Sequence, residues 1–157
     1  ELKEENLVVV IRDFTSYLRT RISSKVSIIF DAENTPDILI PLNRYLFEWV
    51  IENLCKNSVD AMDGCGTITI VVTEEPRHVH IDITDTGKGI PPKKQKTIFN
   101  PGYTSKSRGW GLGLTLARRI IKEYHKGKLF VKNSVVGEGT TMRITLNKPK
   151  TKSAISH

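Results

Sequence analysis

The sequence predicts an α+β fold in which two or three helices and five or six strands form one layered domain. The strongest observation is the alternation that places apolar residues at every second position over 67–73 and again over 78–85, which is typical of half-buried strands. A second observation is the helical spacing of apolar residues near the N-terminus and again upstream of residue 63. The third is length, because 157 residues suit one domain with a single sizeable core.

The first forty residues predict a helix and two strands. Apolar residues between Glu1 and Ile22 lie near one helical face, which predicts a helix over that range. Lys25 to Phe30 has the composition of a strand, and the turn-like Asp31 to Pro36 follows it. Ile38 to Ile40 is a short apolar run that fits a brief second strand.

The middle of the chain predicts a long helix and then two strands. Pro41 fits the first turn of a helix that runs to about Asp63, where a pair of glycines ends it. Thr67 to Thr73 and His78 to Asp85 then form the two strands with the clearest alternation in the sequence.

The C-terminal third contains a long irregular segment, a helix and two strands. Thr86 to Trp110 has no lasting periodicity, and a structureless segment of this length in a compact domain predicts a binding function. Leu112 to Tyr124 predicts a helix that Gly127 ends. The closing strands are expected over 128–135 and 140–146. We therefore expect one domain over residues 1–147 and a disordered tail over 148–157.

Composition and charge exclude several classes of protein. The chain has no apolar run near the ~20 residues of a membrane span, and its acidic start does not resemble a signal peptide. We expect a soluble, cytoplasmic domain, and a membrane anchor elsewhere in a longer parent protein stays open. Cys55 and Cys65 lack metal or redox spacing, which favours structural thiols that are buried or half-buried in a reducing compartment. The net charge of +7 is scattered along the chain, which favours a solvated surface over nucleic-acid binding.

The long helix changes character halfway along one of its faces. That face begins with apolar side chains and ends with polar ones, in the order Leu42, Tyr45, Leu46, Trp49, Asn53, Lys56, Asn57 and Asp60. The opposite face stays largely apolar, so the polar groups point inward and need partners. Hydrogen bonds to neighbouring backbone and a polar ligand with a cation explain them equally well.

Asp85 is an inward-facing carboxylate at the end of an apolar strand. It shares strand parity with Val79, Ile81 and Ile83, so the pleat directs its side chain to the core. Gly87 and Gly89 follow at once and allow backbone to approach a flat ligand closely. A carboxylate in this position suits an exocyclic amino group, and an ordinary cap of the following turn is the alternative. Thr140 also has inward parity, so its hydroxyl is a plausible second contact to a nucleobase that carries such an amino group.

Alternating glycines from Gly109 to Gly113 come directly before a predicted helix. Backbone N–H groups and the positive end of the helix dipole make such a terminus a phosphate site. Lys106 and Arg108 lie just upstream and add positive charge. The sequence lacks a GxxxxGK[ST] loop, and it lacks a GxGxxG placed after a strand with an acidic residue ~20 positions on. Two common nucleotide motifs are therefore excluded.

In this order the motifs resemble those of the catalytic, ATP-binding domain of sensor histidine kinases. This family belongs to a superfamily with gyrase-type topoisomerases, ninety-kilodalton heat-shock chaperones and mismatch-repair ATPases. The boxes that carry the resemblance are Glu52-Asn-Leu-Cys-Lys-Asn-Ser-Val-Asp-Ala61, Asp85-Thr-Gly-Lys-Gly89, Ile98-Phe-Asn-Pro-Gly-Tyr-Thr-Ser-Lys106, Gly109-Trp-Gly-Leu-Gly-Leu114 and Gly137-Glu-Gly-Thr-Thr141. The resemblance runs from about residue 5 to 147 and is specific as a set.

The resemblance implies a fold, two cofactors and a set of site residues. The fold is a two-layer α/β sandwich of the Bergerat type, a mixed sheet of about five strands with three helices on one face. The cofactors are ATP and Mg²⁺, with Asn57 as the metal ligand, Asp85 on the adenine amino group and Phe99 at the base of a mobile lid. Catalytic roles fall on Asn53, Asn57 and Lys106. The nucleotide contacts are Asn53, Lys56, Asn57, Asp60, Asp85, Gly87, Gly89, Ile90, Phe99, Tyr103, Thr104, Ser105, Lys106, Gly109, Gly111, Leu112, Gly113, Leu114 and Thr140.

One departure from the superfamily separates the possible functions. The hydrolysing relatives carry Glu where this chain has Asn53, and an amide does not act as a general base at neutral pH. Glu52 lies ~100° away around the helix and is a poor substitute. A protein-histidine kinase is favoured over an ATP-driven clamp of the chaperone or mismatch-repair type, and a non-catalytic nucleotide sensor is the third hypothesis.

The family's phosphoacceptor histidine is missing from the sequence. His78, His80, His125 and His157 do not have its surroundings, and all four are expected on the surface. The resemblance implies that the acceptor lies on an upstream dimerisation domain and that the phosphoryl group passes on to a response regulator receiver domain. The parent is then expected to be a homodimer, and this fragment a monomer.

Overall fold

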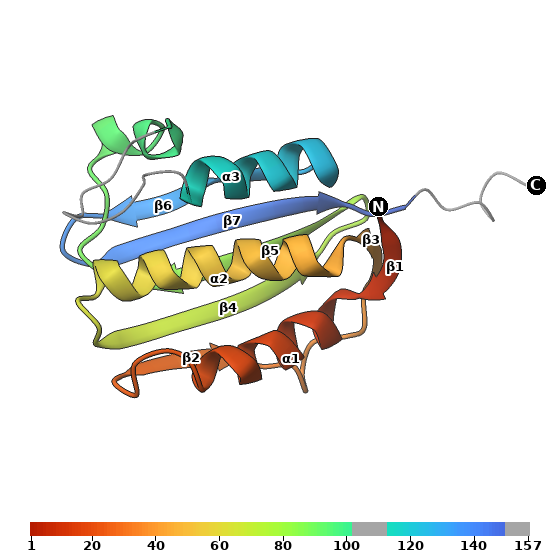
Figure 1. The fold of residues 1–157 in the computed structure, drawn as a ribbon, viewed down its shortest axis with the longest axis horizontal. Helices are drawn as coiled ribbons and strands as arrows, with labels where there is room; N and C mark the ends of the chain where they lie inside the picture. Colours follow the sequence, from red (N-terminus) through yellow and green to blue (C-terminus); the bar gives the residue numbers. More distant parts are fainter. Residues whose placement is uncertain (102–112, 150–157) are drawn as a thin grey trace, which may run out of the picture.

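The fold is a five-stranded mixed sheet, in a computed structural model that describes residues 1–101 and 113–149. The strand order is β2-β4-β5-β7-β6 (Figure 1). The first pair, β2 (Val26–Phe30) and β4 (Gly66–Glu74), is parallel. The strands β5 (His78–Asp85), β7 (Gly139–Asn147) and β6 (Lys128–Val135) add antiparallel neighbours. All five strands were expected, with bounds within about two residues.

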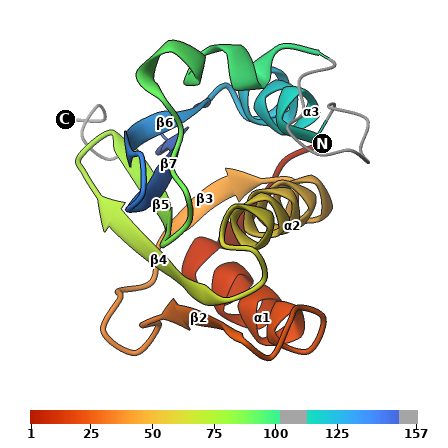
Figure 2. The ribbon, with the colours of Figure 1, turned by 90° about the vertical axis from the view of Figure 1, so that its left-hand side faces the viewer.

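Three α-helices cover one face of this sheet: α1 (Leu7–Arg19), α2 (Arg44–Ala61) and α3 (Gly113–Arg119). Figure 2 shows the helices on one side and the strands on the other. The core lies between these layers, where α2 contributes Phe47 and Leu54 and β5 contributes Ile81, all nearly inaccessible to solvent. The two-layer prediction is confirmed. The described residues also contain two short 3₁₀-helices, at Pro92–Lys94 and Thr97–Phe99, and a π-helical turn, so the predicted helix count was too low.

The expectation of one helix from Glu1 to Ile22 was wrong at its start. Residues Lys3–Asn6 form strand β1, which pairs antiparallel with β3 (Leu39–Leu42) in a separate two-stranded sheet. Helix α1 begins only after Asn6, whose side chain accepts a hydrogen bond from the Val8 N–H at 3.1 Å. Backbone pairing with β3, which lies far along the chain, therefore takes the place of the first helical turns.

Pro41 does not start the long helix, because it lies within β3 and pairs with Glu4. The cap is instead Asn43, whose side-chain oxygen accepts from the Leu46 N–H at 3.1 Å. A proline on a short outer strand is compatible with pairing, since its missing N–H does not have to face the partner strand.

Helix α3 continues without a break into a π-helical turn, Ile120–Tyr124. Its end matches the predicted stop, since the Gly127 N–H donates to the Ile121 carbonyl at 2.9 Å. The left-handed residue there is Lys126, with φ 56°.

His125 lies at this turn, and the expectation that it is a surface residue was wrong, since it is only 6% exposed. Its Nδ1 lies 3.1 Å from the Ile120 carbonyl, and its Nε2 accepts from the Asn43 N–H at 3.1 Å. Because a carbonyl only accepts, the imidazole is neutral with its proton on Nδ1. Burial lowers the pKa of His125 from its ordinary 6.5. The end of α3 is thus bonded to the start of α2.

The two cysteines differ. Cys55 is buried in the core, where burial raises the pKa of its thiol to about 12, as expected of a structural residue. Cys65 is exposed, so the expectation of a buried or half-buried thiol was wrong there.

In the described part of the chain, none of the helices has the length and apolar character that crossing a membrane requires.

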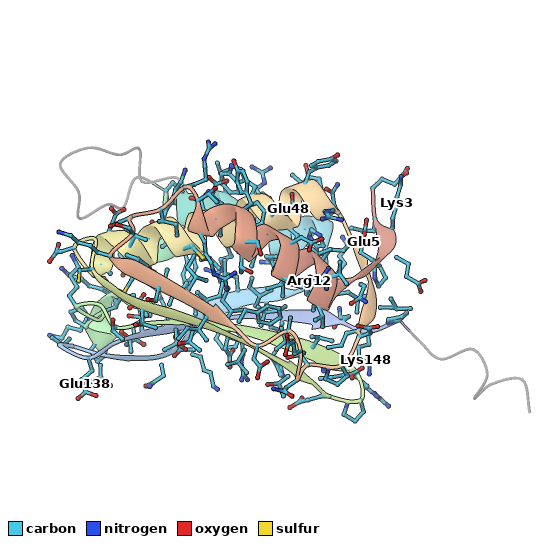
Figure 3. The ribbon with its side chains drawn as sticks, turned by 90° about the horizontal axis from the view of Figure 1, so that it is seen from below. Lys3, Glu5, Arg12, Glu48, Glu138 and Lys148 are labelled. Carbon is cyan, nitrogen blue, oxygen red and sulfur yellow. The ribbon has the colours of Figure 1, made fainter. Side chains whose placement is uncertain are left out.

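The two ends of β7 mark opposite ends of the molecule. Glu138, in the turn before β7, and Lys148, just after it, lie far apart in Figure 3, with Lys3 and Glu5 at the Lys148 end. Lys148 was expected to begin a disordered tail, but its N–H donates to the Arg77 carbonyl at 2.9 Å and its Nζ lies 2.7 Å from Glu74. The remainder of that expectation, from residue 150, lies outside the described residues.

Candidate functional site

The inward carboxylate of Asp85 lies at the Glu138 end of the sheet and is 6% exposed. Its Oδ1 accepts from the Gly87 N–H at 2.9 Å and from the Thr140 N–H at 3.3 Å. Its Oδ2 makes no hydrogen bond to any described residue. Asp85 therefore caps the following turn, as the simpler alternative predicted, and still keeps one oxygen available.

Ser134 of β6 connects Thr140 to the loop after β5, and sequence reasoning missed it. Its Oγ lies 2.7 Å from the Thr140 Oγ1 and accepts from the Ile90 N–H at 2.7 Å. A register shift between Val131 and Asn133 brings Ser134 opposite Thr140. Alternation alone gives no signal for this contact, because the shift changes the strand parity.

Gly87 and Gly89 are required by contacts within the protein. A Cβ on Gly87 would lie 2.8 Å from the Ala61 carbonyl oxygen at the end of α2, and a Cβ on Gly89 would overlap the Val135 carbonyl. Gly89 also has φ 78°, which favours glycine. The neighbouring Lys88 N–H donates to the Ala61 carbonyl at 2.9 Å. The glycines therefore allow this loop to pack tightly between α2 and β6.

Asn53 and Asn57 lie on α2 and are both half-buried. The start of α3 packs against Asn53 so closely that a Cβ on Gly113 would overlap the Asn53 Oδ1. The Asn53 amide is only weakly held, with its Nδ2 at 3.5 Å from the Trp49 carbonyl. Asn57 has no side-chain hydrogen bond to the described residues. Amide oxygen is a ligand type that Mg²⁺ and other hard cations accept, so the Asn57 side chain fits its expected role.

The charged residues on the same face of α2 are more exposed to solvent than the two asparagines. Lys56 and Asp60 are exposed, and the Lys56 Nζ pairs with Glu52 at 3.1 Å. Within the described residues, no group of three His, Cys, Asp or Glu side chains is placed to hold a metal ion.

The apolar stripe predicted to lead into this face is not the buried stripe of α2. Tyr45 is 84% exposed and Trp49 is 36% exposed. The buried side chains of α2 are Phe47, Val50, Ile51, Leu54, Cys55 and Ser58. Helical spacing predicted a common face correctly, but two faces of α2 are apolar in its first turns, and only packing against the sheet selects the buried one.

Phe99 is buried and is held by α3. Its carbonyl accepts from the Thr115 Oγ1 at 2.8 Å, and the Arg118 guanidinium lies over its ring at 5.1 Å. Ile90 and Leu114 are half-buried against the core. Further expected site residues lie outside the described residues: Tyr103, Thr104, Ser105, Lys106, Gly109, Gly111 and Leu112.

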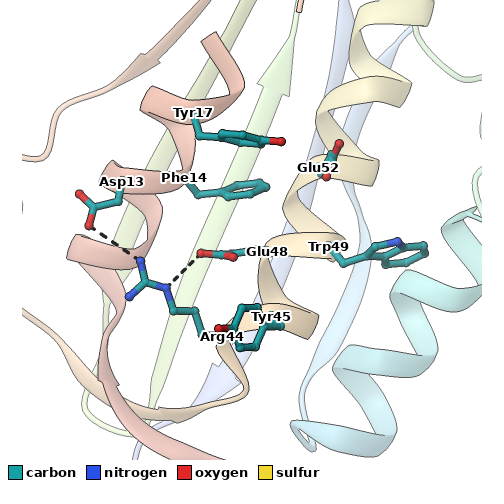
Figure 4. A pocket seen from close by; sticks show the side chains of 8 residues that line it. All are labelled: Asp13, Phe14, Tyr17, Arg44, Tyr45, Glu48, Trp49 and Glu52. Carbon is teal, nitrogen blue, oxygen red and sulfur yellow. Dashed lines mark hydrogen bonds and ion pairs between the residues drawn. The ribbon is translucent and has the colours of Figure 1, made fainter. Parts of the chain in front are cut away.

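A separate groove of about 430 Å³ lies between α1 and α2 (Figure 4). Its aromatic lining is Phe14, Tyr17, Tyr45 and Trp49, and its charged lining is Asp13, Arg44, Glu48 and Glu52. These charges are paired within the domain, because Arg44 contacts Asp13 and Glu48, and Glu52 contacts Lys56. The groove contains none of the expected site residues. It does show that Glu52 faces α1, whereas its neighbour Asn53 faces α3.

Comparisons with known proteins identify the family and the fold of this chain. Residues 43–150 match the model of the family described as histidine kinase-, DNA gyrase B- and HSP90-like ATPase. Sporulation kinase C of Bacillus subtilis (strain 168) is 32% identical over 145 residues, which cover 92% of this chain and 33% of that protein. The chain spans a third or less of the length of the curated relatives it matches.

Two solved structures show the same fold. The nucleotide-free catalytic domain of the histidine kinase ThkA has a TM-score of 0.82 at 27% identity, covering 94% of this chain and 96% of that one. ThkA in complex with the response regulator protein TrrA has a TM-score of 0.78 at 24% identity, covering 94% of this chain and 42% of that one.

Proposed function

Because the chain belongs to the histidine kinase-, DNA gyrase B- and HSP90-like ATPase family, we propose that it binds Mg²⁺-ATP and presents the γ-phosphoryl group to a histidine. The acceptor histidine lies on a separate dimerisation domain. From there the phosphoryl group passes to an aspartate of a response regulator. The enzyme class is protein-histidine kinase.

Asn53 is the observation that carries this proposal. It faces the start of α3, at the position where the hydrolysing relatives carry a carboxylate, and its amide cannot take a proton from water. The adjacent carboxylate, Glu52, lines the α1–α2 groove and pairs with Lys56, so it points away from Asn53. The site thus lacks a base on this helix turn for activating water, which favours transfer to an acceptor that another domain supplies.

Different residues bind the adenine base and the phosphates. Asp85 and Thr140 hold the adenine edge, and Ile90 forms an adjacent apolar wall. The Asn57 amide oxygen holds Mg²⁺, which supplies neutralisation of phosphate charge when bound. Asn53 lies near the terminal phosphate, and Lys106 and the backbone before α3 hold the remaining charge. Catalysis is mainly positioning and electrostatic stabilisation.

The partners of the domain follow from the same chemistry. They are a dimerisation domain with the acceptor histidine, and a response regulator of the kind that TrrA represents for ThkA. We place the domain in the cytoplasm, as part of a homodimeric parent, with the isolated domain a monomer.

Radiolabelled ATP tests the reaction class directly. The chain is incubated with [γ-³²P]ATP, Mg²⁺ and its histidine-containing dimerisation domain. Acid-labile, base-stable label on that domain is the expected result. Steady release of phosphate by the chain alone would instead indicate the ATP-driven clamp. Mg²⁺-dependent binding without transfer would indicate a nucleotide sensor.

A further inference from the structure

The hydroxyl of Ser134 has three hydrogen-bonding contacts. The Ile90 N–H donates to it at 2.7 Å, the Gly139 carbonyl lies at 3.2 Å, and the Thr140 Oγ1 lies at 2.7 Å. These partners come from the loop after β5 and from the start of β7. Ser134 therefore joins the two segments that flank Asp85.

The direction of each hydrogen bond follows from counting protons. A serine hydroxyl has one hydrogen and two lone pairs. The Ile90 N–H only donates and the Gly139 carbonyl only accepts, so the Ser134 hydrogen points to Gly139. The remaining contact is a hydrogen bond only when Thr140 donates. All three contacts are satisfied by this one arrangement.

Thr140 is thereby left as an acceptor toward the site. Its single hydrogen points to Ser134, so only lone pairs of its Oγ1 are available for a ligand. Thr140 is the register partner of Asp85, whose Oδ1 already accepts two N–H groups and whose Oδ2 accepts none from the described residues. Two acceptors therefore lie side by side, at the end of β5 and the start of β7.

We propose that Ser134 is a specificity-determining residue that holds the Thr140 hydroxyl as an acceptor, so that the site selects 6-aminopurine over 6-oxopurine nucleotides. The inference rests on the nucleotide site of the proposed function. A 6-amino group offers hydrogens to these acceptors. A 6-oxo group places a third acceptor against them, and such a mismatch leaves buried polar groups unpaired.

ATP and inosine triphosphate are the matched probes, because they share the sugar and the triphosphate and differ only at C6 and in the proton that the 6-oxo base carries on N1. The ratio of their dissociation constants is measured by calorimetry for the intact chain and for Ser134→Ala. Without Ser134 the Thr140 hydroxyl rotates and can donate to the 6-oxo group. The preference for ATP should fall roughly three- to tenfold, the size of one neutral hydrogen bond.

A double-mutant cycle separates selectivity from folding. Thr140→Val should lower the ATP preference by itself, and adding Ser134→Ala to it should change the preference no further. Ser134→Thr keeps a hydroxyl and should keep the preference. Should Ser134→Ala fail to fold, Ser134→Cys carries the same test, since a thiol is a weak donor and acceptor.

Thr141→Val is the matched structural control. It removes the Thr84–Thr141 hydroxyl pair, 2.8 Å apart, which lies one register position along the same two strands on the opposite face. It should cost similar stability and leave the ATP preference unchanged. An unchanged preference in Ser134→Ala, or an equal fall in Thr141→Val, overturns the inference while ATP binding stands. If the intact chain binds neither nucleotide, the proposed function itself fails and the inference falls with it.

Discussion

The two halves of the candidate site are built differently. The base end, around Asp85 and Thr140, is held by hydrogen bonds between β5, β6, β7 and the loop after β5. The polar face of α2, at Asn53 and Asn57, has almost no side-chain hydrogen bonds to the described residues. The polar groups of the base end are thus largely hydrogen-bonded within the protein. The α2 face instead has polar groups that remain available to bind a ligand.

Because of this difference, substitutions in the two halves should affect the stability of the domain and its affinity for nucleotide differently. A change at the base end should alter both the free energy of unfolding and nucleotide binding, because the same side chains serve both. A change on the α2 face should alter binding alone. Four measurements test that separation, from the largest expected effect to the smallest.

Gly139→Ala should be the most destabilising of the four changes. Gly139 has φ 139°, and a Cβ there would overlap the Asp85 carbonyl oxygen. Overpacking and backbone strain together should lower the free energy of unfolding by about 3 kcal/mol. Gly137→Ala is the control, since Gly137 has φ 85° but open space around it, and should cost only about 1 kcal/mol. Urea denaturation measures both, and equal losses would show that the packing against Asp85 does not matter.

Asp85→Asn should weaken ATP binding roughly 100-fold, because an amide N–H₂ replaces the free acceptor and faces the adenine amino group. The fold should persist, since the Asn oxygen still accepts from Gly87 and Thr140. Asp85→Ala removes that acceptor and should cost about 2 kcal/mol of stability as well. Calorimetry with ATP and GTP, beside thermal melts, checks both. Equal loss of affinity for ATP and GTP would contradict the role of Asp85 in reading adenine.

Asn57→Ala should lower Mg²⁺-ATP affinity roughly 30-fold with little change in melting temperature. The reason is that Asn57 has no hydrogen bond to the described residues to lose. Binding is measured with Mg²⁺ and with EDTA, and the two affinities should become similar in the variant. Ser58→Ala, on the buried face one residue on, is the control: it should change stability without removing the Mg²⁺ dependence. An unchanged Mg²⁺ dependence in Asn57→Ala would show that α2 presents a different ligand.

His125 should make the far end of α2 sensitive to pH. Its folded pKa is lowered by burial, so the unfolded chain takes up the proton first as the pH falls. Stability should be constant well above pH 6.5 and fall by about 1 kcal/mol as the pH drops below it, because protonation removes the acceptor for the Asn43 N–H. His125→Gln keeps an acceptor and a donor and should flatten that dependence. Melting curves between pH 5 and pH 8 measure it, and an equally steep fall in the variant would assign the effect to another group.

Most of the sheet could be predicted from the sequence, and so could the inward direction of Asp85. Strands β5 and β6 have the expected bounds because alternation is a local property that each strand carries by itself. The nucleotide boxes were equally local. Their residues Asn53 and Asn57 do share one half-buried face of α2, while the expected phosphate contacts from 103 to 112 stay a prediction.

Strand β1, the exposure of Tyr45 and Trp49, and the burial of His125 could not be predicted in this way. Each depends on a partner that lies far along the chain: β3 for Lys3–Asn6, the sheet for α2, and Asn43 for the imidazole. Local propensity favours more than one outcome at such positions, and tertiary packing selects among them.

The two acceptors of the base end illustrate the same division. Period-two alternation in the sequence determined that Asp85 and Thr140 point inward. Only the tertiary structure decided what Thr140 presents to a ligand, because the register shift in β6 places Ser134 against it. A side chain's direction follows from its own strand, but the direction of its hydrogen bond depends on the neighbour that the fold supplies.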